Sequence, residues 1–115
     1  MADSDRSCVI PLRKAQDLIP GPPGAHFVTV MQRGTVRVLL SLPVSPNRQT
    51  PHAKDEVYVI VRGRGVLFHA GRRDPFEAGD FIFVVAGTEH RFEDFTDDLA
   101  VWVVFYGPPG GEVPA

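Results

Sequence analysis

The strongest constraint on this chain is that its apolar residues come in short stretches bounded by turn residues, without a sustained helical period. β-branched and aromatic residues are concentrated in the stretches 26–31, 34–42, 56–61, 66–70, 75–78, 81–85, 90–93 and 99–106. Glycines such as Gly63, Gly71 and Gly79 separate several of these stretches. Many short strands divided by such turns are typical of β-sandwiches and β-barrels. The sequence therefore predicts an all-β fold, with a jelly-roll-like β-barrel as the architecture that also protects the strand edges.

Two runs rich in glycine and proline bracket the β-rich part of the chain, at 21–24 and 107–111. Such runs end regular structure, and 115 residues suit a single domain. We therefore expect three parts, namely a partly irregular N-terminal segment (1–25), the β-barrel (26–106) and a C-terminal Gly/Pro tail (107–115).

The charge and the apolar runs narrow the partners that this chain is expected to have. A formal net charge of −2 gives no electrostatic reason to bind nucleic acid. The longest apolar run, 99–106, is too short to span a bilayer, and the N-terminus lacks the pattern of a secretory signal. The one cysteine, Cys8, rules out an intramolecular disulfide and fits a reducing compartment. We expect a cytoplasmic protein with no nucleic-acid or membrane partner.

Two stretches of the sequence carry side chains that can bind a metal. The first runs from Thr50 through His52 to Glu56, and the second, 79–94, contains His90. Two imidazoles and one carboxylate can hold a divalent metal and leave other coordination positions open. Taken singly, each of these residues is more simply a hydrogen-bonded histidine or a surface acid. Their combination in an all-β chain makes a metal site the leading hypothesis.

The spacing of these residues resembles that of the cupin superfamily, small β-barrels that often carry one metal. The first cupin motif is Gly, five residues, His, one residue, His, three or four residues, Glu, six residues, Gly. His52, Glu56 and Gly63 match its second histidine, its glutamate and its closing glycine. Val44 and Thr50 stand where the motif has its opening glycine and its first histidine.

The second cupin motif is Gly, five residues, Pro, one residue, Gly, two residues, His, three residues, Asn. Gly79, Gly87 and His90 match it, whereas Val85 replaces the proline and Asp94 replaces the asparagine. The two motifs together extend the resemblance over most of the chain.

The resemblance implies a cupin barrel that binds one divalent metal ion through His52, Glu56 and His90. This ligand set suits Fe, Mn, Zn, Ni or Co, so it does not identify the element. Because cupins often pair, and because a domain of this size is only marginally stable alone, a homodimer is also expected.

The ligand set favours an enzyme acting on a small molecule, of dioxygenase or isomerase/lyase type, because three protein ligands leave room for substrate or oxygen. A non-catalytic small-ligand-binding or sensor cupin is the alternative, and a barrel with a structural metal or none is a third reading. Thr50 is a candidate catalytic residue that would hydrogen-bond a metal-bound water.

Three further polar residues are candidates for the same site. Tyr58 is a candidate acid or substrate hydrogen bonder, with a packed core tyrosine as the alternative. Arg37 would either reach a substrate carboxylate or simply lie exposed. Gln49 is the nearby alternative for a fourth ligand, but strand alternation predicts that it faces away from His52.

Overall fold

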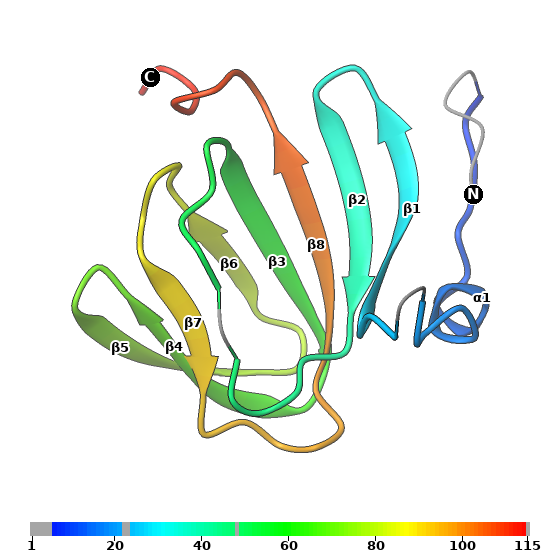
Figure 1. Ribbon diagram of the computed structural model, residues 1–115, viewed down its shortest axis with the longest axis horizontal. Helices are drawn as coiled ribbons and strands as arrows, with labels where there is room; N and C mark the ends of the chain where they lie inside the picture. Colours follow the sequence, from blue (N-terminus) through cyan, green and yellow to red (C-terminus); the bar gives the residue numbers. More distant parts are fainter. Residues whose placement is uncertain (1–5, 22–23, 48, 115) are drawn as a thin grey trace.

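The computed structural model describes residues 6–21, 24–47 and 49–114, which form eight strands and one short helix (Figure 1). The elements are α1 (Leu12–Gln16), β1 (Phe27–Arg33), β2 (Val36–Ser41), β3 (Asp55–Arg62), β4 (Arg64–His69), β5 (Arg72–Glu77), β6 (Phe81–Val84), β7 (His90–Glu93) and β8 (Ala100–Tyr106). The prediction of an all-β fold is confirmed. Within this described part of the chain, no helix has the length and apolar character needed to cross a membrane.

The strands form two antiparallel sheets that face each other across the core (Figure 1). The larger sheet has the order β1-β2-β8-β3-β6 and the smaller one has the order β5-β4-β7. Neighbours such as β3 and β8 are distant in sequence, as expected of a jelly-roll-like chain path. No strand ladder joins the two sheets within the described residues, so the predicted barrel takes the form of a sandwich and not of a closed hydrogen-bonded ring.

The core lies between the sheets and receives side chains from both of them. Its buried apolar members are Leu39, Tyr58, Ile60, Leu67, Phe76, Val84, Phe92, Leu99, Val101 and Val103. Along β3, Glu56, Tyr58 and Ile60 point into this core, because alternate residues of a strand share a face. Glu56 is only 2% exposed, so β3 carries a carboxyl group into an otherwise apolar interior.

The N-terminal segment covers part of the outer face of the larger sheet. Ala15 of α1 is completely buried together with Val30 of β1 and Leu40 of β2. Figure 1 shows α1 beside the β1 edge. At the opposite edge, Phe81 and Phe83 of β6 are 67% and 46% exposed. The outer face of the larger sheet is therefore covered by the N-terminal segment near the β1 edge and exposed to solvent near the β6 edge.

Gly63, the closing glycine of the first motif, lies between β3 and β4 and has two physical reasons to be glycine. Its φ is +87°, which side chains with a Cβ rarely adopt. A Cβ at this position would also lie 2.7 Å from Thr96 Oγ1 and 2.8 Å from Leu99 Cα. The turn therefore packs directly against the backbone that leads into β8.

We expect Gly63→Ala to destabilise the fold for both reasons. The left-handed φ costs about 1–2 kcal/mol, and the clash with Leu99 should add about 1–3 kcal/mol. Gly71→Ala is the matched control, because Gly71 has a φ of +79° and a Cβ added there would meet nothing within 4 Å. Urea unfolding of both variants measures the difference. Equal losses in the two variants would show that the close approach at Gly63 is unimportant.

Candidate metal centre

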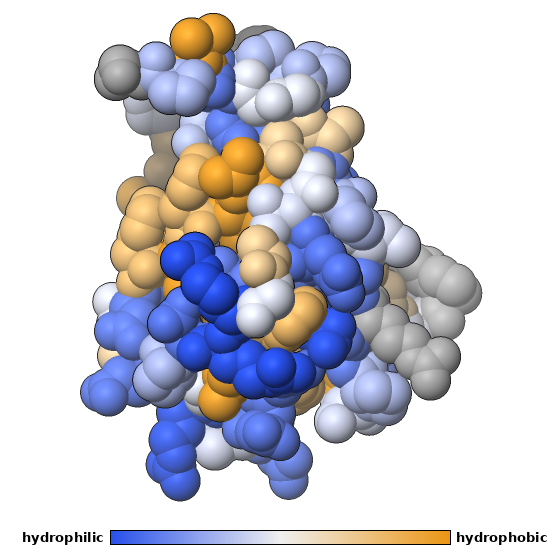
Figure 2. Space-filling model, turned by 90° about the vertical axis from the view of Figure 1, so that its left-hand side faces the viewer, coloured by the Kyte–Doolittle hydropathy of each residue, from blue (hydrophilic) through white to orange (hydrophobic). Residues whose placement is uncertain are grey.

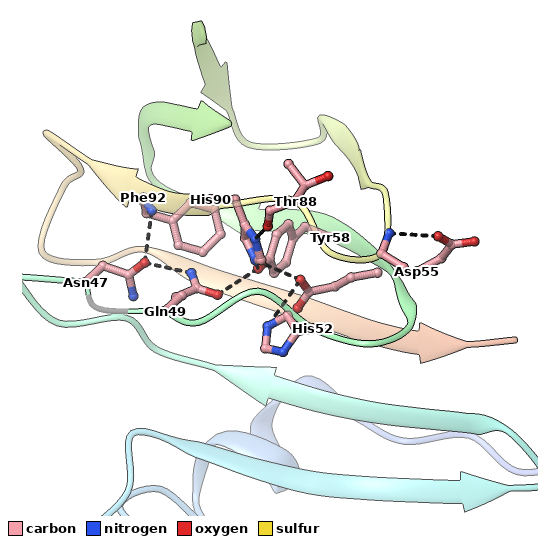
Figure 3. Close-up of polar contacts among 10 residues, drawn as sticks. Asn47, Gln49, His52, Asp55, Tyr58, Thr88, His90 and Phe92 are labelled. Atoms are coloured by element: carbon pink, nitrogen blue, oxygen red, sulfur yellow. Dashed lines mark hydrogen bonds and ion pairs between the residues drawn. The ribbon is translucent and has the colours of Figure 1, made fainter. Parts of the chain in front are cut away.

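The three residues predicted to bind a metal come together in the core. Candidate ligand atoms of His52, Glu56 and His90 all lie within 4.8 Å of one another. Glu56 belongs to β3, His90 begins β7, and His52 lies in the loop that precedes β3 (Figure 3). Glu56 and His90 are each 2% exposed, whereas the side chain of His52 is 32% exposed. The cluster therefore has two buried members and one member that reaches the surface.

The contacts of His90 determine which of its ring nitrogens carries a hydrogen. Nδ1 lies 2.8 Å from the carbonyl oxygen of Thr88, which can only accept, so Nδ1 must be the donor. Nε2 lies 3.0 Å from Glu56 Oε1 and 3.1 Å from the Tyr58 hydroxyl. In the neutral ring Nε2 would then direct a lone pair at a carboxylate oxygen. Such a contact is repulsive unless a cation, either a second proton or a metal ion, lies between the two atoms.

A chain of hydrogen bonds determines the direction in which Tyr58 donates (Figure 3). The backbone N–H of Phe92 donates to Asn47 Oδ1 at 2.9 Å, and Gln49 Nε2 donates to the same oxygen at 2.7 Å. The Tyr58 hydroxyl donates to Gln49 Oε1 at 3.1 Å. Because a backbone N–H can only donate, it fixes the polarity of every following bond. The Tyr58 hydroxyl therefore donates its single hydrogen to Gln49 and directs a lone pair at His90 Nε2.

The prediction that Gln49 faces away from His52 is wrong. Gln49 lines the same cavity as His52 and accepts the hydrogen bond from Tyr58. Strand alternation fails here because the segment before β3 is an irregular loop.

Tyr58 is buried in the core, as the alternative reading of this residue proposed. Burial, and after it the charge of Glu56, raises the pKa of Tyr58 well above its usual value, so the phenol is neutral.

The chemistry of Glu56 fits a metal ion. While the His90 ring is neutral with its hydrogen on Nδ1, the buried Oε1 of Glu56 has no hydrogen-bond donor among the described residues. It nevertheless lies 3.0 Å from His90 Nε2 and 3.7 Å from His52 Nε2. A buried carboxylate oxygen without a partner is costly. A divalent cation held by these three residues would satisfy the oxygen and both nitrogens together, although the donor set does not select the element.

The two imidazoles differ in their proton affinity. Burial lowers the pKa of His52, and the positive charges of His90 and Arg37 add to this, while Glu56 opposes them. Burial also lowers the pKa of His90, but hydrogen bonds to Glu56 and to the Thr88 carbonyl outweigh it and leave that pKa raised. In the absence of a metal, the proton that relieves the repulsion at Glu56 therefore belongs mainly to His90.

A cavity of about 350 Å³ opens beside the cluster. His52, Glu56 and Tyr58 contribute polar groups to its wall, as do Asn47, Gln49, Thr50, Ser41 and Arg37. Its apolar lining consists of Phe27, Leu39, Phe92, Val103 and Phe105. Thr50 is exposed at this cavity, and its role beside a metal stays a prediction. Ligand sites are commonly built in this way, from an apolar cavity with a few polar groups.

Asp55 supports the centre, and sequence reasoning did not single it out. Its Oδ1 accepts the N–H of Ala86 at 3.0 Å, and its Oδ2 accepts the N–H of Glu112 at 2.9 Å. These two backbone donors hold its pKa below the usual value. Asp55 thereby ties the start of β3 to the loop before β7 and to the C-terminal tail. An acid at a strand start carries no sequence signal for such a role, because both partners are distant backbone groups.

Comparison with known proteins identifies the family. Residues 39–106 match the family described as the cupin domain, and the matched part contains the whole cluster. The chain belongs to the cupin family. An uncharacterized protein of Streptomyces coelicolor is 34% identical over 86 residues, which are 74% of this chain and 82% of the relative.

Solved structures show the same fold. A cupin 2 conserved barrel domain protein from Salinispora arenicola superposes with a TM-score of 0.67 at 19% identity, covering 89% of this chain and 90% of that one. The DMSP lyase DddQ from Ruegeria pomeroyi superposes with a TM-score of 0.61 at 17% identity, covering 70% of this chain and 46% of that one. At these identities the similarity establishes the cupin fold and leaves the reaction open.

The opposite pKa shifts of the two imidazoles are open to direct measurement. In the metal-free protein, His90 should titrate above pH 6.5 and His52 below it. His90 therefore contributes stability that is fully present below pH 6.5 and is lost as the pH rises through its raised folded-state pKa. Imidazole ¹H–¹⁵N spectra recorded over a pH series measure both groups.

One equivalent of Zn²⁺ should abolish both titrations near neutral pH, because a nitrogen that binds metal is not protonated. His69 is the internal control, because its Nε2 contacts Asp74 Oδ2 at 2.6 Å and it stands outside the cluster. His69 pairs with His90 across β4 and β7, so its ring nitrogens should show at most a small neighbour effect and no shift of the size that direct zinc binding causes. Unchanged titration of His52 and His90 in the presence of zinc would contradict metal binding at this cluster.

Proposed function

We propose that this protein is a metal-dependent cupin enzyme that acts on a small molecule. The observation that carries the proposal is the buried Oε1 of Glu56, which has no hydrogen-bond donor among the described residues while His90 is neutral, and which lies beside a cavity of about 350 Å³. A cation would satisfy this oxygen, and the cavity would admit a substrate next to that cation.

His52, Glu56 and His90 would hold the metal. A divalent metal in such a site supplies a Lewis acid and, where it is redox-active, a means of activating dioxygen. The chain supplies the orientation, since the carbonyl of Thr88 fixes the ring of His90. Phe105, whose ring centroid lies 4.8 Å from that of His52, belongs to the apolar wall of the cavity.

Dioxygenase and isomerase/lyase chemistry both fit this arrangement. The Ruegeria pomeroyi neighbour is named as a lyase, which gives a precedent for lyase chemistry on this fold but assigns no reaction here. A non-catalytic binding or sensor protein is the second candidate. The observation that favours it is the hydrogen bond from Tyr58 to Gln49, because the buried phenol then has no hydrogen free for a substrate.

We expect His52→Ala and His90→Ala each to lower the metal content of the purified protein, because each removes one of three ligands. The fold should persist, since the packing between the sheets comes mainly from apolar residues. His69→Ala is the matched control and should retain the metal. Elemental analysis and circular dichroism together measure the outcome. Full metal occupancy in both cluster variants would remove these histidines from the site.

Turnover then separates the candidate functions. Protein loaded with Fe²⁺, Mn²⁺ or Zn²⁺ is incubated with a panel of small acids, thiols and phenols, with and without oxygen. Oxygen uptake that depends on His90 would assign a dioxygenase, and conversion without oxygen would assign an isomerase or lyase. Saturable binding with no conversion across the panel would support the sensor function instead.

We also propose a homodimer formed through the open end of the outer sheet face. Phe81 pairs with Val59 across β6 and β3, and Val59 pairs with Trp102 of β8, so one apolar row crosses three strands. Trp102 packs against the cluster that the N-terminal segment covers, whereas Phe81 and Val59 are exposed. Figure 2 shows hydrophobic surface gathered in the upper left of that view, above a mainly hydrophilic area. A second copy of the chain would bury the exposed part of this face, next to the part that α1 already covers.

Phe81→Ser combined with Phe83→Ser should convert the dimer to a monomer, because it makes the open face polar. Val113→Ser is the control, since Val113 is 89% exposed and lies in the C-terminal tail, outside β6 and β3. Light scattering coupled to size-exclusion chromatography gives the mass of each protein. A monomeric parent protein, or a dimer that survives the double substitution, would count against this face.

A further inference from the structure

Arg37 is the one arginine or lysine among the described residues that line the cavity. It lies on β2, where alternation places it on the same face as Leu39 and Ser41, both of which line the cavity as well. Leu40, which lies between Leu39 and Ser41 in β2, points to the opposite face of the sheet and is buried against the N-terminal segment. The register of β2 therefore directs a permanent positive charge to the side of the sheet that carries the candidate metal centre.

Arg37 is exposed, as one of its two readings expected, and its guanidinium is held by a contact that does not neutralise its charge. Its Nε donates to Thr29 Oγ1 at 3.2 Å, and its Cζ lies 5.9 Å from the centroid of the Phe105 ring. Within residues 6–21, 24–47 and 49–114, no carboxylate forms an ion pair with it. The contact through Nε orients the group, and its terminal N–H donors keep their capacity to bind an anion.

The same aromatic ring connects Arg37 to the metal centre. The Phe105 ring centroid is 4.8 Å from that of His52 and 5.9 Å from Arg37 Cζ. Arg37 and the cluster therefore lie within reach of one molecule a few bonds long.

We propose that the substrate is a small organic acid whose carboxylate binds Arg37 while its other end lies at His52, Glu56 and His90. This inference rests on the proposed function and adds the substrate class. A guanidinium binds a carboxylate through two parallel N–H···O bonds, which a neutral amide cannot match. The body of the substrate should be apolar, because Leu39, Val103 and Phe105 form much of the wall between the two ends.

The test uses Zn²⁺-loaded protein and matched pairs of ligands, so that it needs no turnover. Phenylacetate, 3-phenylpropanoate and 4-phenylbutanoate are each compared with the corresponding amide by ligand-observed NMR titration. At least one acid should bind the parent protein about tenfold more tightly than its amide, which is the ratio that one partly solvated charged hydrogen-bond pair supplies.

Arg37→Gln should remove this preference while leaving amide binding and zinc content unchanged, and Arg37→Lys should keep part of it. Arg72→Gln is the matched control, because it removes the same charge from an exposed position on β5 outside the cavity. The inference is overturned if no acid is preferred over its amide, or if the preference survives Arg37→Gln. A parent protein that binds no zinc would instead refute the metal centre, so the two failures are distinguishable.

Discussion

A carboxylate buried between two imidazoles is the constraint on which the rest of this centre depends. Glu56 lies inside because it shares the core-facing register of β3 with Tyr58 and Ile60. Shifting that register by one residue would move the whole apolar set to the outer face, so the packing of β3 fixes the carboxylate as well. The desolvation of Glu56 is then unavoidable, and a cation at the two Nε2 atoms is the direct way to offset it.

The backbone of β7 controls the proton positions on both sides of this cation site. Thr88, just before the strand, accepts from Nδ1 of His90. Phe92, within the strand, donates into the chain of amides that ends at the Tyr58 hydroxyl. One backbone carbonyl and one backbone N–H thus leave two lone pairs, on His90 Nε2 and on Tyr58, pointing at the same place. These fixed backbone groups orient the ring of His90 and the hydroxyl of Tyr58.

The parts of this centre that the sequence predicts are those set by regular structure or by the cupin motif. Alternation along β3 explains why Glu56 lies inside. His52 lies in the loop before β3, so its place in the cluster was predicted by its match to the cupin motif and not by strand alternation. The position of Gln49 was mispredicted because the loop before β3 has no period from which a direction follows. Asp55 was not identified, since its partners are backbone N–H groups that any residue would provide. Sequence patterns report which face a strand residue occupies, but they do not report how a loop folds back over it.

The two faces of β3 connect the centre to the proposed dimer. Inside, Glu56 and Tyr58 belong to the site, and outside, Val57 and Val59 form part of the apolar face that runs to β6. The buried carboxylate of Glu56 destabilises β3. Val59, on the outer face of the same strand, is exposed. A second copy packed on that outer face would bury Val59 and pack against the outer side of β3. Dimer formation would then stabilise the strand that carries the metal ligand, so that assembly and metal binding favour each other through a single element.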